Sequence, residues 1–196
     1  MRQDHRLIVN WVNPQSRVLD LGCGSGLLLK TLAGEKQAFG YGLELNPEKI
    51  QTCIENGVNV IEHDIDSGLS KFPDQSYDYV IISLALQALK RPNETLDEML
   101  RVGREVIISF PNFAHFRTRA YLALKGKMPV SKSLPYEWYE TPNIHLCTIR
   151  DFEELCQSKG YRIVDRQLMN SEGQTLHSIW PNLFASTAFY KITRDV

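Results

Sequence analysis

A short apolar segment near the start of the chain leads into three glycines at alternating positions. Residues 17–21 (RVLDL) predict a buried strand, residues 22–26 (GCGSG) a tight turn, and residues 27–32 a helix. Because glycine has no Cβ, such a turn can be tight, a ligand can approach its backbone, and the helix can pack close to the strand. This strand–turn–helix unit favours folds in which strands and helices alternate.

The alternation of strand and helix patterns continues through the first half of the chain. Asn46 and Pro47 predict the N-cap and the first position of a helix that ends near Gly57. Apolar spacing predicts a helix before Pro14, and another is expected over residues 93–103. The further predicted strands cover residues 39–45, 58–61, 77–83 and 105–110. Right-handed crossovers between such strands predict a parallel sheet with helices on both faces.

The alternation breaks over residues 112–147. We expect Asn112 to cap a helix that ends at Gly126. The apolar stripe of that helix would consist of Phe113, Phe116, Ala120, Tyr121 and Leu124. Residues 127–146 contain prolines and several aromatic side chains without a helix or strand period. Long irregular segments are uncommon inside compact domains and are often functional, so we interpret this insert as a packed lid or a binding surface.

The remainder of the chain returns to regular structure. Residues 148–151 (TIRD) form a capping-box pattern that predicts a helix up to Gly160, and final strands are expected near residues 161–168 and 184–192. A length of 196 residues is closer to one domain than to two. We therefore predict a single domain over residues 1–196, with the lid or insert at about 112–147.

Charge and cysteine content exclude several classes of function. The net charge of −1 gives no global field toward nucleic acid or an anionic membrane, and no apolar run reaches the length of about 18 residues that a span needs. The four cysteines contain no Cys-x-x-Cys pair, which suits reduced thiols in a cytoplasm and argues against a metal site. We predict a cytoplasmic protein that binds neither nucleic acid nor membrane.

The insert nevertheless carries a local group of cations. It could meet RNA, an acyl-CoA phosphate or an acidic partner, although a solvated helix face is the default interpretation. The alternation of aromatic and basic residues that is typical of an RNA-binding platform is absent from it. The group consists of Arg117, Arg119, Lys125, Lys127 and Lys132.

An acidic residue, Glu44, follows the second predicted strand. A carboxylate at this position can accept hydrogen bonds from both hydroxyls of a ribose. The turn has the pattern Gly-x-Gly-x-Gly and lacks the Gly-x-Gly-x-x-Gly spacing of dinucleotide enzymes. A structural turn would be the commoner explanation of the glycines alone, but the order of strand, turn, helix, strand and carboxylate favours a nucleoside ligand without phosphates.

These residues resemble the class I S-adenosylmethionine-dependent methyltransferases. Residues 20–26 resemble the first motif of that family, and Glu44 matches the acid that holds the cofactor ribose. Asp64 matches the position that recognises the adenine amino group, with Ile65 beside the ring, and residues 72–80 resemble the lead into the fourth strand. The resemblance covers residues 9–192 and implies a Rossmann-like α/β fold. Its mostly parallel sheet would have seven strands, with helices on both faces and the last strand antiparallel.

The resemblance also implies a cofactor, S-adenosylmethionine or its product S-adenosylhomocysteine. The residues expected to bind it are Asp20, Gly22, Cys23, Gly24, Gly26, Glu44, Leu45, Asp64, Ile65 and Ser83.

A more specific resemblance comes from four longer strings. Residues 83–89 (SLALQAL), 109–117 (SFPNFAHFR), 126–130 (GKMPV) and 134–148 (LPYEWYETPNIHLCT) are similar to the MetW family of methionine biosynthesis proteins. The family implies a methyltransferase fold that acts as a partner of a homoserine O-acyltransferase of the α/β-hydrolase type. The nucleophile for acyl transfer would then belong to the partner, and this chain has no Gly-x-Ser-x-Gly elbow.

The alternative is an S-adenosylmethionine-dependent methyltransferase that acts on a small molecule. Methyl transfer needs mainly alignment and desolvation, so the absence of an evident acid–base pair does not exclude it. His115, Glu137 and His145 are candidate bases, but each more often serves in packing or hydrogen bonding. Aromatic side chains of the insert could stack on a substrate, line a partner interface or close a lid. The partner or lid candidates are His115, Arg117, Tyr136, Trp138, Tyr139 and His145.

Overall fold

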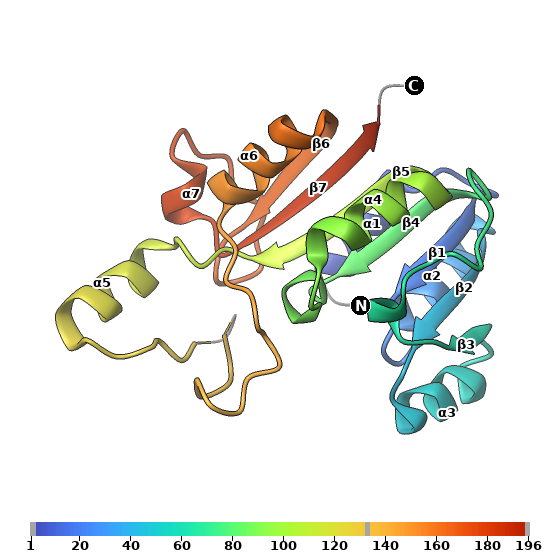
Figure 1. Ribbon diagram of the computed structural model, residues 1–196, viewed down its shortest axis with the longest axis horizontal. Coiled ribbons are helices and arrows are strands. Elements are labelled where there is room, and N and C mark those ends of the chain that lie inside the picture. The colour runs from blue at the N-terminus through green and yellow to red at the C-terminus, as the bar shows by residue number, and fades with distance from the viewer. Residues whose placement is uncertain (1–2, 132–133, 195–196) are drawn as a thin grey trace.

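A twisted seven-stranded sheet forms the centre of the molecule. The computed structural model describes residues 3–131 and 134–194, and its sheet has the order β3-β2-β1-β4-β5-β7-β6 (Figure 1). Strands β1 to β5 pair in parallel, and β7 runs antiparallel to both of its neighbours, β5 and β6. The predicted sheet, with its last strand antiparallel, is confirmed. Its strands are β1 Arg17–Leu21, β2 Phe39–Glu44, β3 Val60–Glu62, β4 Tyr77–Ser83, β5 Gly103–Pro111, β6 Tyr161–Met169 and β7 Thr187–Arg194.

Helices cover both faces of the sheet, as predicted. On β1 the side chains alternate, with Val18 packed on the face covered by α1 and α2 and Leu19 on the face covered by α4 and α6. The helices are α1 Gln3–Trp11, α2 Leu27–Lys36, α3 Pro47–Glu55, α4 Pro92–Val102, α5 Phe116–Lys125, α6 Ile149–Lys159 and α7 Pro181–Phe184. Two short 3₁₀ turns are η1 Ile65–Ser67 and η2 Leu86–Ala88. Among the described residues, no helix has the length and apolar content of a membrane span.

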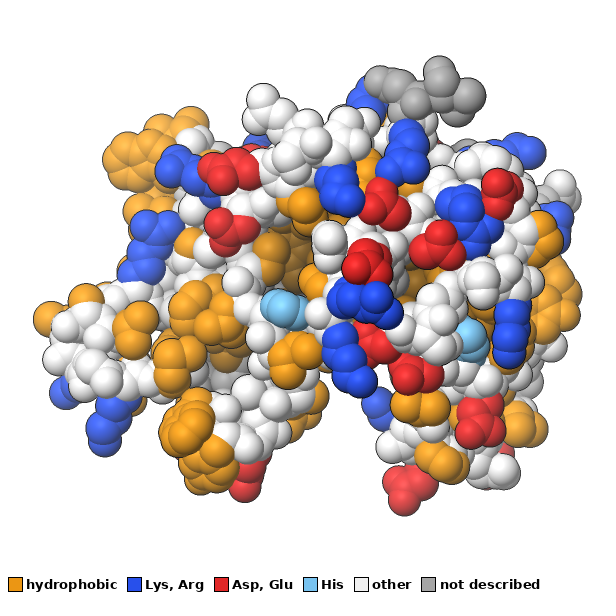
Figure 2. Space-filling view, in the orientation of Figure 1, with side chains coloured by type: hydrophobic (Ala, Val, Ile, Leu, Met, Phe, Trp, Pro, Cys, Tyr) orange, Lys and Arg blue, Asp and Glu red, His pale blue; other side chains and the backbone are white. Residues whose placement is uncertain are grey.

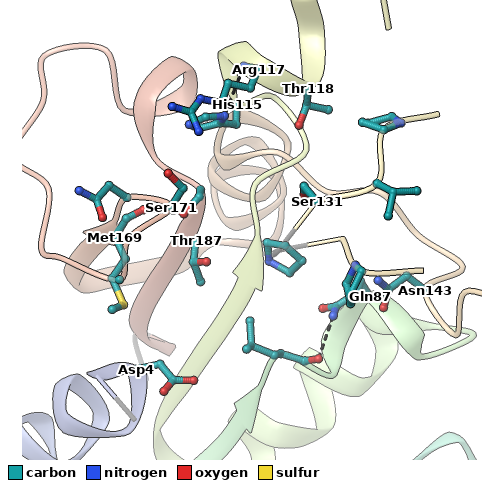
Figure 3. Close-up of a pocket in the computed structure, with 18 of the residues that line it drawn as sticks. Asp4, Gln87, His115, Arg117, Thr118, Ser131, Asn143, Met169, Ser171 and Thr187 are labelled. Carbon is teal, nitrogen blue, oxygen red and sulfur yellow. Dashed lines mark hydrogen bonds between the residues drawn. The ribbon is translucent and has the colours of Figure 1, made fainter. Parts of the chain in front are cut away.

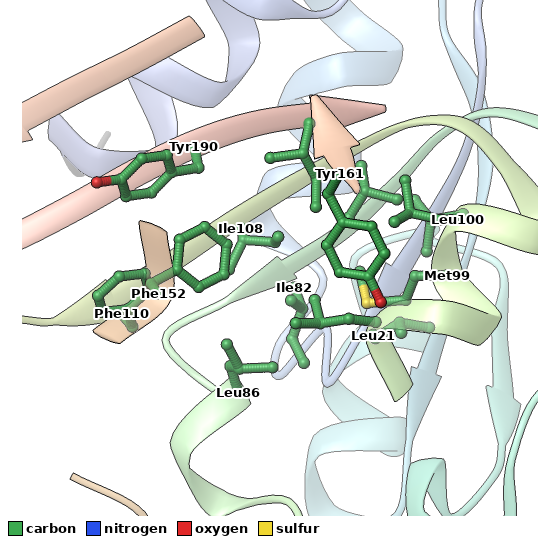
Figure 4. Packing of buried hydrophobic residues seen from close by; sticks show 14 of the residues in the cluster. Leu21, Ile82, Leu86, Met99, Leu100, Ile108, Phe110, Phe152, Tyr161 and Tyr190 are labelled. Atoms are coloured by element: carbon green, nitrogen blue, oxygen red, sulfur yellow. The ribbon is translucent and has the colours of Figure 1, made fainter. Parts of the chain in front are cut away.

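The face under α4 and α6 contains the larger aromatic side chains. Phe110, Phe152 and Tyr190 are fully buried, and their ring centroids lie 4.7 to 5.9 Å apart (Figure 4). Because these rings come from β5, α6 and β7, they join the C-terminal antiparallel strands to the parallel half of the sheet.

Two helix starts follow the predicted capping chemistry. The Asn46 side chain accepts hydrogen bonds from the N–H groups of Glu48 and Lys49 at the start of α3. Thr148 and Asp151 form the reciprocal capping box of α6, which ends at Gly160 in the left-handed conformation. Both predictions are confirmed.

The predicted role of Asn112 as a helix cap is wrong. Helix α5 begins at Phe116 with His115 as its N-cap, and it ends at Gly126 as predicted. The Asn112 side chain is buried and donates to the carbonyl oxygens of Asn182 and Ala185 (3.1 and 2.8 Å). Asn112 therefore ties the start of the insert to the segment that precedes β7.

Residues 112–147 are predicted to be a packed lid or a binding surface, but their central part is not packed on the domain, so the binding surface stays a prediction. Tyr136, Trp138 and Tyr139 are 50, 70 and 66% exposed, and helix α5 projects away from the sheet with only Thr118 buried (Figure 1). The expected apolar stripe of α5 faces solvent, with Leu124 83% exposed. Figure 2 shows hydrophobic side chains gathered on this projecting part of the molecule. Lys132, one of the basic residues of the insert, lies outside the described residues.

Candidate functional site

The glycine turn is held against the end of β2. Gly22, Gly24 and Gly26 all have positive φ angles, which L side chains rarely adopt. The N–H groups of Gly22 and Cys23 donate to the carbonyl oxygen of Leu43 (2.8 and 3.1 Å). A Cβ added at Gly24 would meet no atom within 4 Å, so a ligand can approach the turn there.

Glu44, the last residue of β2, holds the backbone of the glycine turn and of the segment that follows β2. Its carboxylate is buried, and Oε2 accepts a hydrogen bond from the N–H of Gly24 at 2.9 Å. Oε1 accepts from the N–H groups of Leu45 and Asn46, each at 3.0 Å. A carboxylate offers about four acceptor positions, so one position, on Oε2, is left for a ligand hydroxyl. Accepting both ribose hydroxyls requires one of the backbone N–H groups to move.

Asp20 is a buried carboxylate without a compensating partner. It is 3% exposed at the carboxyl end of β1, and within the described part of the chain no group donates a hydrogen bond to its side chain. Burial, and secondly the negative charge of Glu44, raise the pKa of Asp20 from 3.8 to about 7. A cation bound beside these two acids would lower that pKa and would relieve their repulsion.

The remaining cofactor candidates lie along the same edge of the sheet. A Cβ on Gly22 would lie 3.8 Å from the Ile65 side chain and 3.4 Å from that of Ala85. Asp64 is exposed and caps η1 through the N–H of Asp66, while Leu45 is 55% exposed. The sequence had not suggested Ala85, because its place beside the turn depends on the neighbouring strands.

Ser83 stands at the end of β4, beside the glycine turn. Its hydroxyl lies 3.1 Å from that of Ser109 on β5, and Ser109 Oγ accepts a hydrogen bond from the N–H of Leu84. Ser83 is therefore already engaged with the neighbouring strand.

Cys23 packs inside the turn. Its Sγ lies 3.8 Å from the Sγ of Cys53, and burial raises the pKa of the Cys23 thiol far above its usual range. A thiol with such a pKa is a poor nucleophile, so packing is the role that the geometry supports. In residues 3–131 and 134–194, no group of three acidic, histidine or cysteine side chains could hold a metal.

We expect Gly42→Ala to destabilise the protein by about 1–3 kcal/mol, because the new methyl group would overlap the Sγ of Cys23 and lie 2.8 Å from its Cβ. Gly34→Ala is the matched control, since a Cβ on this α2 residue meets nothing within 4 Å. The control should stabilise the protein by about 0.5–1 kcal/mol. Urea unfolding measures both effects. Equal stability of the two variants would contradict the tight packing of the turn against β2.

No hydrogen bond among the described residues joins the partner or lid candidates to the glycine turn. His115 is buried and its Nδ1 accepts from the N–H of Arg117, whose guanidinium lies over the Phe116 ring. His145 contacts the carbonyl oxygen of Lys90 at 3.3 Å. None of the described side chains forms an evident acid–base pair at the turn itself.

Solved structures resemble this fold closely. A SAM dependent methyltransferase from Archaeoglobus fulgidus superposes with a TM-score of 0.71 at 19% identity, covering 98% of this chain and 91% of that one. The [4+2]-cyclase SpnF superposes with a TM-score of 0.69 at 16% identity, covering 99% and 81%. The fold is that of the class I S-adenosylmethionine-dependent methyltransferases. Because the fold also carries a cyclase, it does not by itself establish methyl transfer.

Sequence comparison identifies the family within this class. Residues 2–192 match the family model of the methionine biosynthesis protein MetW, and the chain belongs to that family. The bifunctional methionine biosynthesis protein MetXA/MetW of Rhodopirellula baltica is 34% identical over 98% of this chain. The ubiquinone biosynthesis O-methyltransferase of Saccharophagus degradans is 29% identical over 62% of it. The chain spans 33% of the first relative's length and 53% of the second's.

Proposed function

We propose that this protein binds S-adenosylmethionine or S-adenosylhomocysteine at the glycine turn and acts with a homoserine O-acyltransferase in methionine biosynthesis. The partnership is supported by the relative from Rhodopirellula baltica, a bifunctional protein whose name combines MetXA and MetW. This chain spans 33% of that relative's length, and we infer that it acts together with the activity that the name MetXA denotes.

The chemistry of the glycine turn suits this cofactor. S-adenosylmethionine carries a sulfonium and an ammonium group, and the buried carboxylates of Asp20 and Glu44 favour a cationic ligand. Gly24 leaves the turn open, and α2 begins at Leu27 with Gly26 as its N-cap, which supplies no side-chain hydrogen bond. Free N–H groups at the start of α2 could therefore accept a carboxylate from the ligand. The bound cofactor would supply an activated methyl group, or would act only as a signal.

The exposed insert suits the partner. Helix α5 has ten residues and makes little contact with the domain, and isolated helices of that length are marginally stable in water. Aromatic residues are enriched among the side chains that contribute most to binding at protein interfaces. Tyr136 exposes half of its surface, and Trp138 and Tyr139 expose about two thirds or more of theirs. We infer that the acyltransferase covers the insert.

The decisive test is the rate of homoserine acyl transfer by the cognate acyltransferase, measured with and without this protein and with and without S-adenosylmethionine. We expect the protein to change the rate, and the ligand to change it further if the site is a sensor. An unchanged rate under all four conditions would overturn the proposed partnership. Small-molecule acceptors would then be screened for methyl transfer, which is the alternative activity of this fold.

We expect Trp138→Ala and Tyr139→Ala each to weaken the complex with the acyltransferase by about tenfold or more, because large aromatic anchors dominate interface energies. Phe39→Ala is the matched control, since Phe39 is an aromatic residue of β2 that is 56% exposed outside the insert. All three variants should keep the thermal stability of the wild type, because the changed side chains are exposed. Equal affinities of the three variants, measured by calorimetry, would exclude this face as the interface.

A further inference from the structure

A cavity of about 1120 Å³ lies between the insert and the C-terminal strands. Its wall comes from the segments that follow β4 and β5, from α1, and from β6, β7 and the loop between them (Figure 3). The insert contributes residues 129–131, 135–136 and 142–143. The cavity shares no lining residue with the glycine turn or with Glu44. The cavity is therefore lined by other residues than the proposed cofactor site, although Leu84 in its wall follows Ser83 directly.

One end of the cavity presents hydrogen-bond donors. Arg117 and His115 lie together there in Figure 3. Within the described part of the chain the Arg117 guanidinium has no carboxylate partner, and it contacts only the ring of Phe116. Because Nδ1 of His115 accepts from the N–H of Arg117 at 3.3 Å, the proton of the neutral ring lies on Nε2. Burial, and secondly the charge of Arg117, lower the pKa of His115, which keeps this ring neutral.

Another part of the cavity wall, away from Arg117, presents an acceptor, the side chain of Gln87. Gln87 is 7% exposed, and its Nε2 donates to the carbonyl oxygen of Leu84 at 2.8 Å. Its Oε1 is buried and has no hydrogen-bond partner among residues 3–131 and 134–194. Buried polar atoms are rarely left unpaired in native proteins, so an unpaired amide oxygen in a cavity wall indicates a missing donor. Asp4 also lines the cavity, and Figure 3 shows it on the other side of β5 from Gln87. Because Gln87 Oε1 has no accessible surface, a ligand reaches it through a small local movement of the wall.

Gln87 also couples the cavity to the insert. Its backbone oxygen accepts hydrogen bonds from the N–H groups of Ile144 and His145, both at 3.0 Å. A ligand held by the Gln87 side chain would therefore act on the same residue that anchors the end of the insert.

We propose that this cavity is a second ligand site, which takes a metabolite with a carboxylate at one end and an amino group at the other. The carboxylate faces Arg117 and the Nε2–H of His115, because a guanidinium without a protein partner is a preferred site for a carboxylate. The ammonium group faces Gln87 Oε1. This assignment stands whether or not the glycine turn binds S-adenosylmethionine.

Linear amino acids of different length test the assignment on the full chain. The probes are γ-aminobutyrate, δ-aminovalerate and ε-aminocaproate, with hexanoate and hexylamine as controls that each lack one charged group. Protein-observed NMR gives the affinities. We expect one of the amino acids to bind at least about tenfold more tightly than either control. Equal affinities for amino acid and controls, or no binding of any probe at about 10 mM, would overturn the proposal.

Substitutions then locate the bound probe. Arg117→Ala should lower the affinity for the best amino acid by about tenfold and leave the affinity for hexylamine unchanged. Lys125 is a cation of the same helix outside the cavity, so Lys125→Ala should change neither affinity. Gln87→Met should lower the affinity for the amino acid and the affinity for hexylamine to the same extent. Near-ultraviolet circular dichroism checks that this variant keeps its fold. If it does not, the comparison of Arg117→Ala with Lys125→Ala alone tests whether the probe binds in the cavity. Equal binding by Arg117→Ala and Lys125→Ala would show that the probe does not sit in this cavity.

Discussion

Replacing Glu44 by alanine should lower the affinity for S-adenosylmethionine by about 100-fold or more. Hydrogen bonds to a charged group contribute about 1.5–3 kcal/mol each, and tenfold in affinity corresponds to about 1.4 kcal/mol. The variant loses the acceptor for the ribose. It also loses the three bonds by which Glu44 holds the N–H groups of Gly24, Leu45 and Asn46. The glycine turn would then no longer be fixed in the geometry that receives the ligand.

Titration calorimetry measures this loss, with Glu55→Ala as the matched control. Glu55 is an exposed acid on α3 whose carboxylate accepts a hydrogen bond from Gln51, so its removal should leave the affinity unchanged. Glu44→Gln separates the two causes. It keeps an oxygen for Leu45 and Asn46, but its NH₂ group would face the N–H of Gly24. If Glu44→Ala stays folded and binds the ligand as tightly as the wild type, the proposed cofactor site is wrong.

The parallel half of the sheet could be predicted because its strands are buried on both faces and bounded by turn residues. The strands at residues 17–21 and 77–83 match β1 and β4 residue for residue. The boundaries of less buried elements were less accurate. Strand β3 starts at Val60 rather than at residue 58, and Phe184 belongs to α7 rather than to the last strand. Short edge elements contain too few apolar residues to define their ends.

The insert could not be predicted because its contacts are distant in the sequence. Asn112 precedes α5 like a capping residue, but its hydrogen-bond partners include Asn182 and Ala185, seventy or more positions away. The sequence does not distinguish an aromatic side chain that packs on the core of its own domain from one that is exposed and free to contact another protein. Only the structure shows that Trp138 is exposed.

The sequence predicted which residues belong to the candidate site more readily than the hydrogen bonds that these residues form. The sequence places Glu44 at a strand end, but it does not show that backbone N–H groups already occupy most of its acceptor positions. The cavity between the insert and β7 had no sequence signal. Gln87 and Arg117 lie in two separate strings that resemble the MetW family, but nothing in their spacing predicts that both line one cavity.

Replacing Asp20 by asparagine should stabilise the ligand-free protein above pH 7 by up to roughly 4 kcal/mol. This figure corresponds to the rise of the Asp20 pKa from 3.8 to about 7. Asparagine has nearly the same shape and carries no charge, so the variant avoids a buried ion that has no partner. At pH 4 the wild-type carboxyl is largely protonated in the folded protein, and the advantage of the variant should nearly vanish.

The sign of the pH dependence follows from the protons bound in each state. Between about pH 4 and pH 7 the folded wild type holds a proton on Asp20 that the unfolded chain has released. Its free energy of unfolding therefore falls as pH rises through this window and levels off above it. Urea unfolding from pH 4 to pH 8 measures this slope. Comparing wild type with Asp20→Asn removes the contributions of other groups, because distant groups titrate alike in both proteins.

A bound cation should reverse the advantage of the variant. S-adenosylmethionine beside Asp20 would favour the ionised carboxylate, so the wild type should bind it more tightly at pH 8 than at pH 6, whereas Asp20→Asn should bind it equally at both. The second cause of the raised pKa is the charge of Glu44, so Glu44→Ala should also flatten the stability slope. Parallel slopes in wild type and Asp20→Asn would mean that Asp20 is already ionised in the folded protein. A cation would then not be needed to balance the two acids at this edge of the sheet.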